Sequence, residues 1–170
     1  MSEAAVVDDA GLRAGVLWEL GWLVEIAGDY DSAIRYLEEA RGIYTEMGTV
    51  ARIMETAALL AKCALGQGRS EDARHDATRV WSYLQTQGTA AMDEAVATHL
   101  TIAEVFAALA ELTGAGNDSP TVWAVVAAGY ELVMARAEKI SDPQWRRSFL
   151  ENVPANRAIV AWRQRLQEND

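Results

Sequence analysis

The 170-residue sequence predicts an all-α protein: a solenoid of about three helical hairpins, followed by one or two C-terminal capping helices. Glycines recur after 40 residues, because Gly28 returns as Gly68 and the pair Gly48-Thr49 as Gly88-Thr89. A fixed period of this size is typical of arrays of helical hairpins. No region alternates polar and apolar residues with period two, and the chain holds only 3 prolines, so strands are not expected.

Apolar spacing and turn residues divide the chain into three segments. We expect a flexible N-terminus at 1–9, helical repeats at 10–140 and capping helices at 141–170. The individual helices are expected at about 10–27, 30–47, 50–66, 70–87, 90–112, 120–140, 143–150 and 155–167.

The first predicted helix has an apolar stripe with spacings of three and four residues, which is typical of a buried helix face. Asp8 or Asp9 is expected to cap its start, and Gly28 to end it in the left-handed conformation. The residues expected to face the core are Leu12, Val16, Leu17, Leu20, Leu23, Val24 and Ala27.

The second predicted helix begins at Asp29 or Asp31, and its small residues Ala33 and Ala40 allow close approach to the first helix. Thr49 and Thr89 are expected to cap the third and fifth helices. The third repeat departs from the 40-residue period, so Ala124 and Ala128 are both candidates for the role of Ala33.

The last segment begins with a strong helix-start pattern. The run Ser141-Asp142-Pro143-Gln144 provides a capping residue, a proline just inside the helix, and Gln144 placed to reach back to the cap. The apolar residues that we expect to cover the end of the array are Trp145, Phe149, Val153, Ile159 and Trp162.

Residues 16–40 resemble the tetratricopeptide repeat (TPR). Leu20-Gly21 matches the Leu-Gly pair of its first helix, and Gly28-Asp29-Tyr30, Ala33 and Ala40 match its turn and second helix. The second copy departs from the pattern, with Ala61 in place of Gly21 and Ser70 in place of Tyr30. The resemblance implies a right-handed solenoid whose first helices line a concave groove.

Residues 129–160 resemble the segment that closes the C-terminal repeat region of large bacterial signalling ATPases and transcriptional regulators. Asp142-Pro143, the run from Arg146 to Pro154, and Arg157 carry the match. This resemblance implies a regulatory part of a bacterial signal-transduction or transcription-regulating protein.

Composition narrows the functional classes. A net charge of -10 opposes nucleic-acid binding, because phosphate contacts need clustered Lys and Arg. The single Cys63 excludes an internal disulfide and favours a reducing, cytoplasmic location. No apolar run of about 18 residues is apparent, so no membrane span is expected.

No pattern for catalysis or for a cofactor stands out. His75 and His99 fall on different predicted helices, Cys63 has no CxxC partner, and no phosphate loop or nucleophile elbow is present. We therefore expect no enzyme activity, no metal and no cofactor, with His99 in the core or at its boundary and His75 on the surface.

The candidate binding residues lie in the groove implied by the resemblance. Trp18 and Trp22 are four residues apart and share a helix face with Glu25 or Ile26. The alternative is that both tryptophans are packed under neighbouring helices or used in self-association. As a separate hypothesis, the Trp18/Trp22 face at the end of the solenoid predicts a homodimer. The candidate groove residues are Trp18, Trp22, Glu25, Glu55, Ala58, Lys62 and Leu65.

These observations favour a non-catalytic scaffold that binds a protein partner or a partner helix. The alternative is a repeat domain that senses a small-molecule effector in a cavity.

Overall fold

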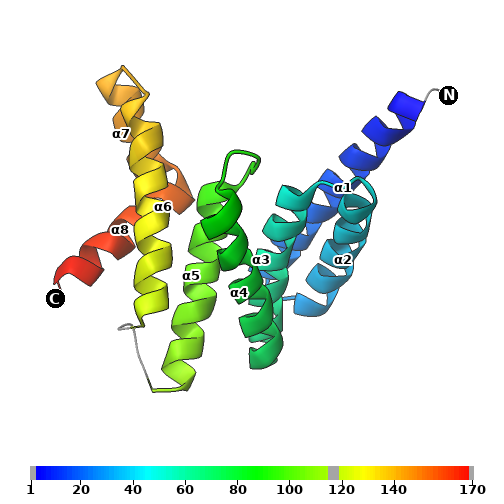
Figure 1. The fold of residues 1–170 in the computed structure, drawn as a ribbon, viewed down its shortest axis with the longest axis horizontal. Helices are drawn as coiled ribbons and strands as arrows, with labels where there is room; N and C mark the ends of the chain where they lie inside the picture. The colour runs from blue at the N-terminus through cyan, green and yellow to red at the C-terminus, as the bar shows by residue number, and fades with distance from the viewer. Residues whose placement is uncertain (1–2, 115–118, 169–170) are drawn as a thin grey trace. The chain divides into compact units, whose positions relative to one another are not determined.

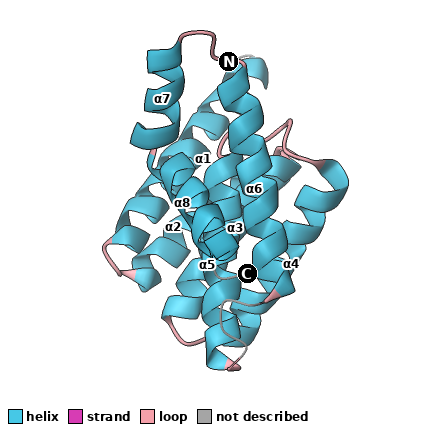
Figure 2. Cartoon of the chain, turned by 90° about the vertical axis from the view of Figure 1, so that its left-hand side faces the viewer, coloured by secondary structure: helices cyan, strands magenta, loops and turns pink. Residues whose placement is uncertain are grey.

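The computed structural model describes residues 3–114 and 119–168, with side chains from residue 9 to 114 and from 119 to 167. These residues form helices, turns and no strand (Figure 2). The all-α prediction is therefore confirmed. The helices are α1 (Glu3–Ile26), α2 (Tyr30–Glu46), α3 (Val50–Gly66), α4 (Ser70–Gln87), α5 (Ala95–Leu112), α6 (Pro120–Glu138), α7 (Pro143–Asn152) and α8 (Pro154–Glu168).

The chain forms two compact units that divide between Asp93 and Glu94, a boundary that the sequence did not predict. The first unit contains the hairpins α1–α2 and α3–α4, which are drawn from blue to green in Figure 1. The second unit contains α5, α6, α7 and α8.

Glycines end the helices of the first unit at intervals of twenty residues. Gly28, Gly48, Gly68 and Gly88 have φ angles of 81°, 68°, 76° and 71°. This left-handed region is strained for residues with a Cβ atom but open to glycine. The forty-residue period of the sequence therefore reflects the same glycine conformation at successive helix ends.

Two aspartates, each among the candidates that the sequence offered, cap α2 and α7. Asp29 accepts a hydrogen bond from the Ser32 amide at 3.1 Å, and hydrogen bonding with Ser32 lowers the pKa of Asp29. Asp142 accepts hydrogen bonds from the amides of Gln144 and Trp145. Thr49 occupies the cap position of α3, but its hydroxyl donates to the Tyr44 carbonyl at 3.2 Å instead.

Small residues set the close packing of the first hairpin. A Cβ atom at Gly21 would lie 2.6 Å from Cγ of Leu37, so the two helices approach at a distance that only glycine permits. Ala33 and Ala40 are fully buried on the facing side of α2. Further along, a Cβ atom at Gly66 would lie 2.3 Å from the Tyr30 ring, so this ring from α2 packs directly on the glycine of α3.

The prediction for the inward face of α1 is largely wrong. The buried positions are Ala14, Trp18, Gly21 and Glu25, whereas Leu17 and Val24 are only partly buried. Because Leu37 packs closely on Gly21, the face of α1 that contains Gly21 lies against α2. The aliphatic stripe therefore lies on the solvent-exposed side of α1. Five residues that were expected to be buried are exposed: Leu12, Val16, Leu20, Leu23 and Ala27.

Two helix starts differ from prediction. α1 begins at Glu3, so Asp8 and Asp9 lie within the helix rather than at its cap; the Glu-Ala-Ala segment favours helix and contains no breaker. Residues 1–2 of the expected flexible N-terminus lie outside the described residues. α5 begins at Ala95 and not near 90, because residues 89–92 form a turn in which the Met92 amide donates to the Thr89 carbonyl.

The second unit packs α5 against α6 and α8 around Val96, Val133 and Ile159. The close approach here is made by Gly129, where a Cβ atom would lie 3.1 Å from Cβ of His99. Neither Ala124 nor Ala128 is buried, so neither repeats the role of Ala33.

The helix α7 has no buried residue, although it was expected to cover the end of the array. Its Trp145 is 71% exposed and does not join the core, contrary to prediction. Phe149 and Leu150 of α7 are partly buried and pack against the core cluster of the second unit, as expected for Phe149. The guanidinium of Arg146 donates to the Ile140 carbonyl, and the Asn156 amide donates to the Phe149 carbonyl, so apolar and polar contacts together hold this helix in place.

By length and composition alone, α5 is apolar enough to cross a membrane, a feature that the sequence analysis overlooked. Its mean hydropathy is 1.5, and 67% of this stretch is buried inside the structure. The core helix of a soluble protein has the same properties.

Candidate functional site

The seven predicted groove residues come from α1 and α3, and the structure separates them into two groups. Trp18, Glu25, Glu55 and Ala58 are buried, so a partner does not reach their side chains without movement. Trp22 is 41% exposed, and Leu65 and Lys62 are partly exposed. We call the exposed face formed by Trp22, Lys62 and Leu65 the α1–α3 surface.

Two tryptophans connect this surface to the core. The rings of Trp18 and Trp22 are stacked, with centroids 6.3 Å apart and planes at 29°. Their spacing of four residues places them on adjacent turns of α1. Trp18 belongs to the buried cluster that includes Tyr44 and Leu59, so the Trp22 ring stacks on a ring that is held in the core.

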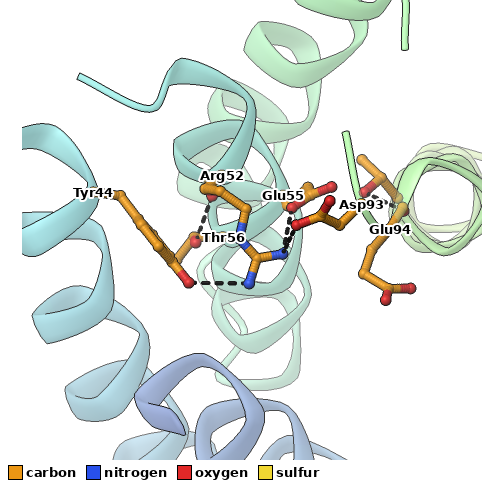
Figure 3. Close-up of polar contacts among 7 residues, drawn as sticks. Tyr44, Arg52, Glu55, Thr56, Asp93 and Glu94 are labelled. Atoms are coloured by element: carbon orange, nitrogen blue, oxygen red, sulfur yellow. Dashed lines mark hydrogen bonds and ion pairs between the residues drawn. The ribbon is translucent and has the colours of Figure 1, made fainter. Parts of the chain in front are cut away.

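Arg52 is the residue that sequence reasoning missed. Its guanidinium lies 5.1 Å from the centre of the Trp18 ring and 5.2 Å from that of Tyr44. It also donates to the Tyr44 hydroxyl at 3.0 Å and to Glu55 at 2.8 Å (Figure 3). The available signal was an arginine three residues before a glutamate in an otherwise apolar helix.

The charge of Arg52 is well compensated. The carboxylate of Asp93 lies 3.5 Å away at the exposed side of the guanidinium (Figure 3). Burial alone would lower the pKa of Arg52, but the hydrogen bond to Tyr44 and the charge of Glu55 outweigh it, so the pKa is raised. This network fixes the orientation of the Trp18 ring.

Glu25 and Lys62, two of the predicted groove residues, form an ion pair. Their charged atoms are 3.4 Å apart, with Glu25 buried and Lys62 partly exposed. Within the described part of the chain, the second oxygen of Glu25 and Nε1 of Trp18 are buried without a hydrogen-bond partner. Unpaired buried polar atoms cost free energy, which a contact reaching them would recover.

Cys63 and the two histidines offer little chemistry. Burial raises the pKa of the Cys63 thiol to about 12, which keeps it protonated and unreactive. His99 is buried as predicted, and burial lowers its pKa. Its Nδ1 lies 2.8 Å from the Ala95 carbonyl oxygen. His75 is exposed as predicted. Among the described residues, no group of three His, Cys, Asp or Glu could hold a metal ion.

A pocket of about 450 Å³ lies in the second unit between α5 and α8. Its size is within the range of small-molecule sites. We call it the α5–α8 pocket; its lining includes Leu100, Glu104, Ala107, Glu111, Trp162 and Arg165.

Comparison of the chain with protein-family models, with curated proteins and with solved structures found no match.

Proposed function

We propose that this chain is a non-catalytic, TPR-like repeat domain that binds a protein partner at the α1–α3 surface. The observation that carries the proposal is the position of Trp22, which is exposed and stacked on the buried Trp18. Tryptophan is enriched among the residues that contribute most to binding energy. An aromatic ring that is already held in place loses little entropy when a partner packs on it.

A charged group on the α1–α3 surface defines the kind of partner. Lys62 is partly exposed beside Glu25, and it offers a positive group at the edge of the apolar surface. A partner helix would place an apolar side chain on Trp22 and a carboxylate near Lys62.

The wider role that we propose is regulatory and cytoplasmic. It rests on the resemblance of residues 129–160 to the repeat regions of bacterial signalling and transcription-regulating proteins. The binding energy would come from surface shape and aromatic contact rather than from bond chemistry.

The test is affinity capture from native lysate with the wild-type chain, Trp22→Ala and Trp145→Ala. Both tryptophans are exposed, but only Trp22 lies on the α1–α3 surface, so Trp145→Ala is the matched control. We expect Trp22→Ala to weaken partner binding by about tenfold or more, while Trp145→Ala leaves it unchanged. A partner retained equally by both variants would contradict the proposal.

The α5–α8 pocket supports a second candidate function, the sensing of a small effector. Trp162 and Arg165 offer an aromatic face and a cation from α8, whereas Glu104 and Glu111 offer carboxylates from α5. Mass spectrometry of small molecules released from the purified chain would test it. A compound that is retained by the wild type and lost in Trp162→Ala favours the sensor, particularly if Trp22→Ala retains it.

A further inference from the structure

The exposed side of α1 carries a regular seam of five residues, with spacings of four, three, four and three. The four apolar members, Leu12, Val16, Leu23 and Ile26, are between 52% and 69% exposed. The central member is Glu19, which is also exposed. This spacing is that of the contact line between two helices of a coiled coil. We call these five residues the α1 seam.

The repeat shows what normally covers such a seam. Forty residues later, the same five register positions lie on α3, where α2 packs against them. These equivalent residues are Arg52, Thr56, Leu59, Cys63 and Gly66.

Contacts with α2 run along the whole of that second seam. At one end Arg52 donates to the Tyr44 hydroxyl, and at the other Gly66 lies under the Tyr30 ring. In the middle, Leu59 and Cys63 belong to the same buried cluster as Tyr44. The register positions that are exposed on α1 are therefore those that α3 uses to bind a helix.

We propose that the α1 seam binds an amphipathic α-helix of a partner protein, in the place that α2 takes on α3. The partner helix presents apolar residues with the same spacing and a Lys or Arg opposite Glu19. Where α3 has Leu59, the α1 seam has a carboxylate at its centre. A single polar residue in such a seam selects the partner and the register.

The position of Glu19 disfavours a second copy of this chain as the occupant. It lies midway between Leu12 and Ile26, at the centre of the seam. A symmetric pairing of two α1 helices, parallel or antiparallel, would set Glu19 against Glu19 across a helix spacing of about 8–10 Å. Like charges in that position oppose self-association.

The α1 seam borders the α1–α3 surface, because Trp22 is three residues from Glu19 and four from Ile26 on α1. Lys62 comes from α3 and pairs with Glu25 rather than with a member of the α1 seam. Trp18 and Glu25, which lie under the α1–α3 surface, are on the buried side of α1. The variant Lys62→Ala therefore serves as a control that alters the α1–α3 surface and leaves the α1 seam intact.

The test uses two synthetic amphipathic peptides, each about three heptads long, with leucine and isoleucine in the contact line. The Lys peptide and the Glu peptide differ only at the central contact position. By fluorescence anisotropy, we expect the wild-type chain and Lys62→Ala to bind the Lys peptide about tenfold more tightly than the Glu peptide. Glu19→Lys should reverse this preference, and added salt should weaken it.

Equal binding of the two peptides, or no binding of either, would overturn the proposal. Light scattering adds an independent measurement. We expect the wild-type chain to have the mass of one copy, 18.6 kDa, at micromolar concentration, and Glu19→Leu to self-associate. A wild-type dimer that dissociates in Val16→Ser would make the second copy the occupant and would also overturn the proposal.

Discussion

The helices α1 and α3 are related by the forty-residue period of the sequence, yet their surroundings differ. Leu60 on α3 is 5% exposed, whereas Leu20, forty residues earlier on α1, is 39% exposed. Cys63 is fully buried, whereas its equivalent Leu23 is exposed. The difference follows from the neighbours: α3 packs against both α2 and α4, and α1 packs mainly against α2. The neighbouring helices therefore decide burial as much as side-chain type does.

The largest expected difference in stability between α1 and α3 comes from replacing Leu20 and Leu60, one at a time, by alanine. Leu60→Ala removes buried methyl groups between packed helices and should lower the free energy of unfolding by about 2–5 kcal/mol. Leu20→Ala should lower it by less than about 1 kcal/mol, since the side chain already contacts solvent. Urea unfolding followed by tryptophan fluorescence gives both values. Equal losses would show that α1 is covered as α3 is.

A smaller effect on stability is expected from glycine-to-alanine substitutions on the two faces of α1. Gly21→Ala places a methyl group 2.6 Å from Cγ of the buried Leu37, which should destabilise the chain by about 1–3 kcal/mol. Gly15→Ala meets no atom within 4 Å and should stabilise the helix by about 0.5–1 kcal/mol. Thermal unfolding of the two variants compares the faces directly. Stabilisation by Gly21→Ala would mean that the hairpin is more loosely packed than described.

Local signals in the sequence predicted the helices well. Glycine at helix ends and aspartate or proline at helix starts act on the adjacent turn, so their effect does not depend on the rest of the fold. For this reason the predicted bounds of α2, α3 and α4 agree with the observed bounds to within one residue. The start of α5 was placed too early because the turn before it lacks a proline or a second glycine.

The inward face of α1 was harder to predict, because the choice between two faces depends on the neighbouring helix. The aliphatic stripe through Leu12 and Leu23 satisfies the spacing rule for a core. The face with Gly21 and Trp18 was selected instead because Leu37 packs directly on the glycine. Arg52 was missed for a similar reason: its partners Trp18 and Tyr44 come from two other helices.

The equivalent positions 23 and 63 also give a chemical comparison with little expected effect on stability. Leu23→Cys places a thiol on the α1 seam, while the native Cys63 remains in the same molecule as the internal reference. At pH 8, a thiol with a pKa of about 12 is ionised in roughly one molecule in 10⁴, against about a quarter for an ordinary exposed thiol. A maleimide should therefore modify the introduced thiol rapidly and Cys63 only after unfolding, as peptide mass spectrometry would show.

The raised pKa of Cys63 also has a consequence for stability. As the pH rises, the thiol of the unfolded chain ionises before that of the folded chain, so the stabilisation is complete below about pH 8.5 and declines above it. Cys63→Ala should remove this part of the pH dependence, whereas Leu23→Cys should add none, because its thiol is exposed in both states. If Cys63 were labelled in the folded chain as fast as the thiol introduced at position 23, the two helices would be equally open to the reagent, and the contrast between α1 and α3 would be wrong. If the Lys peptide slowed labelling at position 23 alone, the reagent would map the docked helix onto the α1 seam.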